Sequence, residues 1–564
     1  MTNKQRNYLV FGIFALLFFL KNLVFHWFSF YEWLPAGETG FLATLAWLLP
    51  KIGSAIFFAS LTFLVKDKRW LVIPAFVIDI WCLANWIYMR NNNFLLDSFA
   101  FNIVGNLNGY WWSCIVFVEL LLDISIFVSS ILVSILVFRT IHKTECQWAA
   151  AAIVLLVSVV CLYASEGLFI LSKDKDQRPS FRWDIATREG RERVYGIDYE
   201  YLVSETSLLS MPLFLIPDYL QIRSGKIYNR DMMPEDLSLA QTRRKPKSEV
   251  NHSDKLIIVI CESLENWLVR PDIMPHLSAI TQLDHVLYAN NVKTQIVGAP
   301  SADGQMIINT GLLPLTEGYT CFRYPQHDYP SLMKMTTDST VMLLPHDTSV
   351  WNQAKMSIAY GYDTTIIYSD VDTALFNKLN EIQQSGVNHI QCITQSTHAP
   401  FVICSQSQLK ETKKMPIFMD RFIRAFNVLD EGLGLFVDRI ATDSTLREYT
   451  IVITADHHIL YHEKREKYQK YCDLNGLDYT PISPALPLII YSPKIEGNIH
   501  ISEPVYQMDI YPTVLHLLGG DDYEWQGFGI NLLDSTALTQ PRIIDEATAF
   551  HVSDLIIRNN WFAH

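Results

Sequence analysis

The sequence predicts an N-terminal bundle of five transmembrane α-helices, followed by an extracytoplasmic α/β domain with a mostly parallel central sheet. Hydrophobic residues make up 50% of the 564 residues and charged residues only 18%, which is typical of a partly membrane-embedded chain. Long apolar stretches recur before residue 172. After residue 253, short apolar runs alternate with helix-like stretches, as they do in α/β domains.

The membrane-embedded part is marked by apolar windows of about 20 residues, the length that crosses a bilayer as a helix. The first window is too long for the apolar core of a signal peptide, and further spans follow it, so we interpret it as a retained helix. The five expected spans are Tyr8–Phe30, Phe41–Val65, Trp70–Met89, Trp111–Phe138 and Trp148–Leu171.

Lysine and arginine placement predicts which loops face the cytoplasm. Basic residues precede the first span and lie between spans two and three and between spans four and five: Lys4, Arg6, Lys66, Lys68, Arg69, Arg139 and Lys143. The other two loops carry almost no positive charge, so five spans place everything after Leu171 outside the cytoplasm. The formal net charge of −13 argues against nucleic acid as a partner.

We expect three regions along the chain: a five-helix transmembrane domain at 1–172, a juxtamembrane linker at 173–252, and a soluble domain at 253–564. The linker contains the apolar stretch Leu208–Leu220, which is too short to span and is interrupted by prolines, so it is expected to lie in the membrane interface. The nine cysteines include no CxxC pair, which leaves zinc-ribbon and thioredoxin-like interpretations unsupported.

The first strand of the soluble domain ends in a candidate ligand. Its five apolar residues, Leu256–Ile260, predict a strand buried on both faces, and Glu262 follows at the carboxyl edge, where open α/β sheets bind ligands. A second such strand, Thr450–Thr454, is followed by Asp456 and His457. Two carboxylates and an imidazole on one rim suit Mn²⁺ or Zn²⁺. The other expected strands are Val341–Leu344, Thr364–Tyr368, His389–Thr394 and Leu486–Tyr491.

Ser301 begins a predicted helix, Ser301–Thr310, and has two interpretations. As an N-cap residue it would only satisfy the first backbone N–H groups of the helix. Beside a metal, its hydroxyl would lose its proton more easily and act as a nucleophile, with helix N–H groups available to hold a phosphate. His398 and His346 also follow strands, so they are expected on the same rim.

Together these stretches resemble the alkaline phosphatase superfamily, and the five spans before an extracellular domain resemble its lipoteichoic acid synthase branch of membrane phosphoglycerol transferases with a sulfatase-like fold. The resemblance covers nearly the whole chain through the motifs VICESLENW, GAPSADGQM, HDTSVWN, TQSTHAPF, TADHH and VYQMDIYPTVLHLLG. It implies that Glu262, Ser301, Asp456 and His457 bind one divalent metal. Mn²⁺ is the expected ion, with Zn²⁺ and Mg²⁺ as alternatives.

The resemblance also implies roles in the substrate pocket. Ser301 would be the nucleophile, and His398 would contact the substrate phosphate. Trp351 and Asn352 would lie beside the glycerophosphate pocket, with His346 near them. The family's next residue is Arg, whereas this chain has Gln353, which cannot offer a charged fork to phosphate. His458 and His462 are further expected to support the metal ligands from behind.

The expected activity is metal-dependent transfer of a phospho-headgroup from a membrane phospholipid, with phosphoglycerol favoured, to a glycan or lipid acceptor through a phosphoserine. Phosphoethanolamine transfer to a cell-envelope glycan or lipid is the first alternative, and an inactive scaffold or sensor that kept the fold is the second. The resemblance places the chain in the bacterial inner (cytoplasmic) membrane as a multi-pass protein. A sulfatase is disfavoured, because Ser301 is not followed by the x-Pro-x-Arg that formylglycine formation requires.

Overall fold

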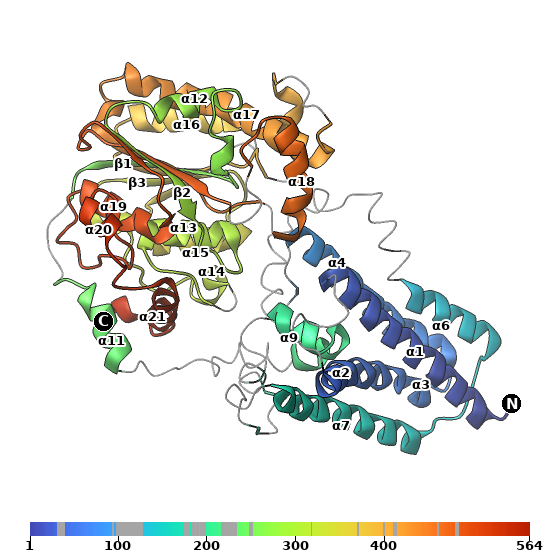
Figure 1. Cartoon of the computed structure of the whole chain (residues 1–564). Coiled ribbons are helices and arrows are strands. Elements are labelled where there is room, and N and C mark those ends of the chain that lie inside the picture. Colours follow the sequence, from blue (N-terminus) through green and yellow to red (C-terminus); the bar gives the residue numbers. More distant parts are fainter. Residues whose placement is uncertain are drawn as a thin grey trace. The chain divides into compact units, whose positions relative to one another are not determined.

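The computed structural model divides into two compact units, one as far as Leu215 and one from Pro234 onward (Figure 1). The structure describes residues 1–30, 40–92, 95–96, 124, 128–173, 181–182, 186–187, 191, 194, 199–215, 234–246, 252–316, 319–368, 372–398, 401–409, 414–459, 462–479 and 484–563.

The first unit is helical. Among the described residues its helices are α1 (Asn3–Phe30), α2 (Phe41–Ala59), α3 (Leu61–Leu64), α4 (Val72–Asn92), α6 (Ser129–Thr140), α7 (Trp148–Ser172) and α9 (Tyr199–Glu205). Within the described residues, four stretches are long and apolar enough to cross a membrane, and they match the first, second, third and fifth expected spans. Of the fourth expected span, Trp111–Phe138, the structure describes mainly the part in α6, and most of the remainder lies outside the described residues.

Two buried lysines in this unit have polar partners. Lys21 on α1 and Asp79 on α4 form an ion pair at 2.9 Å, which balances two charges that would be costly in lipid. The Lys51 ammonium on α2 donates to the backbone carbonyls of Ser204 and Thr206, at 3.2 and 2.8 Å. The segment after the last span therefore binds the helical unit, while the expected boundaries at 172 and 252 stay a prediction.

The second unit is built on a nine-stranded sheet in the order β4-β3-β5-β1-β6-β7-β2-β8, with β9 paired to β2. The strands from β4 to β6 run parallel, β7 is antiparallel to its neighbours, and β8 and β9 run parallel to β2. This confirms the mostly parallel sheet. The strands are β1 (Lys255–Cys261), β2 (Val286–Lys293), β3 (Thr340–Leu344), β4 (Thr364–Ile367), β5 (His389–Ile393), β6 (Tyr449–Ala455), β7 (Leu486–Tyr491), β8 (Asn498–Ile501) and β9 (Val505–Tyr506).

Helices cover both faces of this sheet, which gives three layers (Figure 1). Helices α12, α16 and α17 lie on one side, and α13, α15 and α19 lie on the other (Figure 1). The helices of this unit are α11 (Pro234–Thr242), α12 (Pro275–Ile280), α13 (Pro300–Thr310), α14 (Thr320–Arg323), α15 (Gln353–Ala359), α16 (Asp372–Gln384), α17 (Ile417–Val437), α18 (His462–Leu474), α19 (Ile510–Leu517), α20 (Ser535–Thr539) and α21 (Glu546–Arg558).

The sheet register decides which side chains meet at its carboxyl edge. Strand β1 is central, and its apolar residues from Leu256 to Cys261 are fully buried. It pairs in parallel with β6, with Cys261 opposite Ala455. The next residue on each strand, Glu262 and Asp456, therefore leaves the sheet at the same point, as expected for parallel strands.

Candidate metal centre

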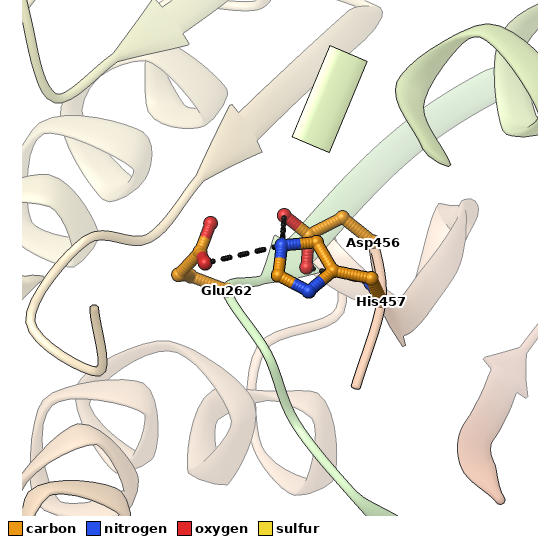
Figure 2. A group of neighbouring side chains, drawn as sticks. All are labelled: Glu262, Asp456 and His457. Atoms are coloured by element: carbon orange, nitrogen blue, oxygen red, sulfur yellow. Dashed lines mark hydrogen bonds and ion pairs between the residues drawn. The ribbon is translucent and has the colours of Figure 1, made fainter. Parts of the chain in front are cut away.

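Glu262, Asp456 and His457 form a compact group at the carboxyl edge of β1 and β6 (Figure 2). One ligand atom from each lies within 4.8 Å of the others. The His457 Nε2 atom is 3.3 Å from Glu262 Oε1 and 3.5 Å from Asp456 Oδ2. Both carboxylates are buried, so they are expected to need a cation between them.

Backbone contacts orient these ligands. Asp456 Oδ1 accepts hydrogen bonds from the backbone N–H groups of Ser263 and His457, at 2.9 and 2.8 Å. His457 Nδ1 lies 3.0 Å from the carbonyl oxygen of His458, an arrangement in which Nδ1–H donates to the carbonyl and the Nε2 lone pair faces the carboxylates.

The donor set fits a divalent cation. Asp456 Oδ2 is buried and has no hydrogen-bond partner among the described residues, which is costly unless something else binds it. Burial and the neighbouring charge of Glu262 raise the pKa of Asp456 to about 7. Burial alone would lower the pKa of His457, but Asp456 and Glu262 raise it to about 10. Both shifts mean that the close carboxylates retain protons, which a divalent cation would displace, and two carboxylate oxygens with one imidazole suit Mn²⁺ or Zn²⁺.

Ser301 lies against this group from the first turn of α13. Its Oγ is 3.3 Å from Glu262 Oε2 and 3.4 Å from His457 Nε2. The N-cap residue of α13 is Ala299 and Pro300 occupies the first turn, so the first of the two interpretations of Ser301, that it only caps the helix, does not hold. Its hydroxyl instead points toward the ligand group, where it could bind the cation or attack a phosphorus atom.

The loop before α13 is fixed by Asp303. One carboxylate oxygen of Asp303 accepts three backbone N–H bonds, from Val297, Gly298 and Ala299, at 2.9 to 3.0 Å. These bonds hold the turn that delivers Ser301 to the edge of the sheet.

Two residues next to the ligands, Ser263 and Gly304, were not predicted from the sequence. Ser263 adopts a left-handed backbone (φ 59°), and its hydroxyl donates to Glu262 Oε1 at 2.8 Å. A left-handed non-glycine residue costs conformational energy, and such residues gather at functional sites. Gly304 in α13 lies so close to β6 that a Cβ there would be 2.5 Å from the carbonyl oxygen of Asp456. Only glycine permits this approach of α13.

The two expected rim histidines lie close enough to act on the ligands electrostatically. His398 lies past the end of β5 and is exposed, and together with His457 it holds the pKa of Glu262 below its usual range, although burial alone would raise it. Burial lowers the pKa of His346, which the charge of Glu262 opposes and that of His398 favours. The structure thus brings both histidines to the rim that carries Glu262.

Trp351 and Asn352 are consecutive left-handed residues, with φ of 49° and 54°. The Trp351 ring lies 6.3 Å from that of Tyr319, and the Asn352 amide donates to the carbonyl of Cys321 at 2.8 Å. This strained pair directly precedes α15, and the indole of Trp351 lies near the ring of Tyr319.

The other predicted site residues are Gln353, His458 and His462, and each has a different place in the structure. Gln353 is buried, and its amide donates to Gln305 Oε1 on α13 at 3.0 Å. His458 supports His457 through its carbonyl oxygen, as described above, and is half-buried. His462 begins α18, and its side chain lies outside the described part of the structure.

Known proteins match both halves of the chain. Residues 1–184 match the lipoteichoic acid synthase N-terminal domain family, and residues 270–520 match the sulfatase family. The chain is lipoteichoic acid synthase-like. The order of the two domains confirms the resemblance on which the sequence interpretation was based.

Relatives match along most of their length at low identity. Lipoteichoic acid synthase 1 from Bacillus subtilis (strain 168) is 21% identical over 96% of this chain and 88% of its own. Lipoteichoic acid synthase from Staphylococcus saprophyticus is 23% identical over 90% of this chain and 82% of its own. The structure of the integral membrane protein lipooligosaccharide phosphoethanolamine transferase A from Neisseria meningitidis is 12% identical, with a TM-score of 0.54 over 91% of this chain and 96% of that one, which shows a shared fold.

Proposed function

We propose that this protein transfers a phospho-headgroup from a membrane phospholipid to a glycan or lipid acceptor, through a phosphoserine at Ser301. The observation that supports this best is the position of the Ser301 hydroxyl, 3.3 Å from Glu262 and 3.4 Å from His457, in a sulfatase-like domain of a membrane-anchored chain. The relatives named above are two lipoteichoic acid synthases and one phosphoethanolamine transferase, which favours headgroup transfer outside the cytoplasm.

Glu262, Asp456, His457 and Ser301 would hold one divalent cation, most readily Mn²⁺. When bound, such a cation lowers the pKa of the serine hydroxyl and stabilises the negative charge that develops on the phosphoryl oxygens.

In the first step, Ser301 Oγ attacks the phosphorus of the lipid phosphodiester. The new P–Oγ bond forms as the bond from phosphorus to the diacylglycerol oxygen breaks. The exposed His398 gives that oxygen a proton, and the proton of Ser301 leaves to solvent. In the second step an acceptor hydroxyl attacks the phosphorus, its proton is taken up by His398, and Ser301 is restored with a proton from solvent.

Substrate recognition would fall to residues around this rim. Trp351, Asn352 and His346 would shape the pocket for the headgroup, and His458 and His462 would support the ligands from behind. Gln353 gives the pocket no cation of its own. Phosphoglycerol is favoured by the named synthases. Phosphoethanolamine stays an alternative, because Gln353 provides no positive charge at the position where the family has Arg.

The direct test is to trap and locate the phosphorylated serine. Full-length protein in nanodiscs is incubated with Mn²⁺ and phosphatidylglycerol or phosphatidylethanolamine, each with labelled acyl chains, and diacylglycerol release is followed. We expect a mass increase on Ser301 of one phospho-headgroup. Ser301→Ala should lower release by about 10³-fold or more, as loss of a nucleophile does, whereas Ser301→Thr should keep part of the activity.

A fully active Ser301→Ala variant would refute the proposed nucleophile. The donor that yields diacylglycerol faster identifies the headgroup. Purified protein that binds neither Mn²⁺ nor Zn²⁺ and releases no diacylglycerol would favour an inactive scaffold.

A further inference from the structure

Two large aliphatic side chains stand exposed beside the segment that carries His398. Val402 is 78% exposed and Ile417 is 72% exposed. Val402 begins a short 3₁₀ helix, Val402–Gln406, only four residues after His398. The backbone N–H of Phe401 donates to the carbonyl of His398 at 3.0 Å, so this helix is tied directly to the histidine of the rim.

The residues next to these two in the sequence are phenylalanines whose rings pack together. Phe401 is buried with a left-handed backbone (φ 61°), and its ring lies 5.2 Å from that of Phe418 and 5.5 Å from that of Phe422. Phe418 follows Ile417 directly and stacks on Tyr468 of α18 at 6.1 Å. The ring contacts thus connect the segment of Val402 with that of Ile417, while both aliphatic side chains face solvent.

A basic residue lies between the two aliphatic residues along the chain. Lys414 is exposed, in a chain whose net charge is −13. Exposed aliphatic residues beside an exposed lysine form a combination that binds an anionic lipid surface, because the apolar groups enter the headgroup boundary and the cation attracts the phosphates.

We propose that Val402, Ile417 and Lys414 form a lip that dips into the anionic bilayer next to the metal centre. The lip would hold the rim against the headgroup of a donor lipid, so that the phosphodiester reaches Ser301 without the lipid leaving the bilayer. This inference rests on the proposed function, since it supplies the route by which a lipid donor reaches the site. A protein surface is the competing occupant, and the experiment below distinguishes it.

The first test detects contact without requiring catalysis. Benzoylphenylalanine is incorporated in place of Val402, Ile417 or Ile543 in the full-length Ser301→Ala protein, in nanodiscs that contain radiolabelled phosphatidylglycerol. Ile543 is 93% exposed in the same unit and serves as the matched control. We expect lipid cross-links at 402 and 417 and few at 543. Cross-links to protein alone, or equal lipid labelling at all three positions, would overturn the lip.

The second test separates the lip from the chemistry. With Val402→Glu and Ile417→Glu combined, we expect kcat/KM for phospholipid in nanodiscs to fall by about tenfold or more, because charges replace the apolar groups that would enter the bilayer. Hydrolysis of a water-soluble phosphodiester, bis-p-nitrophenyl phosphate, should be unchanged, and Ile543→Glu should alter neither rate. Equal loss on both substrates would overturn the proposal.

The third test concerns the charge of Lys414. Lys414→Glu should weaken activity several-fold in nanodiscs rich in phosphatidylglycerol and little in zwitterionic ones, an effect that salt should reduce. An equal effect in both lipid compositions would contradict an electrostatic role. Because the cross-links form in a Ser301→Ala protein, they stay informative even if the donor or the nucleophile has been assigned wrongly.

Discussion

The side-chain amide of Gln507 donates a hydrogen bond to the backbone carbonyl of Asp456 at 2.7 Å, and a longer one to that of Ala455 at 3.2 Å. Its Oε1 accepts from the backbone N–H of Gln295 and the hydroxyl of Thr294, at 3.1 and 2.8 Å. Gln507 is fully buried, so one side chain ties the end of β6, where the metal ligands begin, to the segment after β2.

Replacing this amide should weaken metal binding more than folding. Gln507→Glu keeps the length of the side chain but removes both donors, so the carbonyls of Asp456 and Ala455 lose their partner and face a carboxylate. We expect Mn²⁺ affinity to fall about 10- to 100-fold, the usual cost of removing a group that orients a metal ligand. Calorimetric titration of the full-length protein in detergent measures it.

The matched control is Gln526→Glu. The Gln526 amide also donates to a backbone carbonyl, that of Tyr523 at 2.8 Å, but in the described part of the chain its hydrogen bonds do not reach the metal centre. If the two variants lose stability alike and both keep normal Mn²⁺ affinity, Gln507 serves only the fold.

Gly304→Ala tests the close approach of α13 to β6. The new methyl group would lie 2.5 Å from the carbonyl oxygen of Asp456 and 2.8 Å from its Cα, so α13 must shift and carry Ser301 with it. We expect a loss of about 1–3 kcal/mol in the free energy of unfolding. Diacylglycerol release should fall about 100-fold, since an ångström of misplacement has that effect on positioned groups.

Gly432→Ala in α17 is the comparison, because its Cβ would meet its nearest neighbour at 3.4 Å, an ordinary contact. That variant should gain slightly from helix propensity and keep its activity. Unimpaired transfer by Gly304→Ala would show that the position of α13 tolerates the methyl group.

The ends of β1 and β6 could be predicted from the sequence, because a run of buried apolar residues followed by ligand side chains is a local pattern. Glu262 and Asp456 then meet for a general reason, which is that parallel neighbours end at one edge. The helix start was also locally encoded and was misjudged: Pro300 favours the first turn, which makes Ala299 the N-cap and frees Ser301.

Other features depend on contacts that no local pattern contains. Strand β2 was not predicted, because Asn290 and Asn291 interrupt its apolar alternation where the register with β7 shifts. The role of Gly304 depends on the backbone of Asp456, and that of Gln507 on Asp456 and Gln295, which are distant in sequence. Contacts between residues so distant in the sequence cannot be predicted from a local pattern.

Metal-free and metal-bound protein should respond oppositely to Asp456→Asn. Asparagine can still accept, through Oδ1, the two N–H bonds that Asp456 Oδ1 receives, but it removes one of two close buried carboxylates. In EDTA we expect the variant to be as stable as the wild type or about 1 kcal/mol more stable, because the repulsion with Glu262 is gone.

With Mn²⁺ at about 100 times its Kd, the wild type should gain about 2.7 kcal/mol and the variant much less. Thermal unfolding of the full-length protein with EDTA and with Mn²⁺ gives both comparisons. A variant that Mn²⁺ stabilises as strongly as it does the wild type would exclude Asp456 as a ligand.

His389 should make the protein sensitive to mild acid independently of the metal centre. It lies in β5 and is 2% exposed, and its Nδ1 has no hydrogen-bond partner in the described part of the chain. Burial lowers the pKa of His389 to about 4, despite the opposing charges of Asp338 and Asp254. In the unfolded chain a histidine has a pKa of about 6.5. Between these values the unfolded state binds a proton that the native state rejects.

Stability from this residue is therefore complete above about pH 6.5 and declines as the pH falls toward 4, by up to about 3 kcal/mol. His389→Gln should flatten this part of the pH profile of the free energy of unfolding, measured by denaturant titration of the full-length protein in EDTA. The difference between the two proteins at pH 7.5, where the buried imidazole and the amide are both neutral, reports the packing change alone. If that difference stays constant down to pH 4.5, the acid sensitivity arises from other groups.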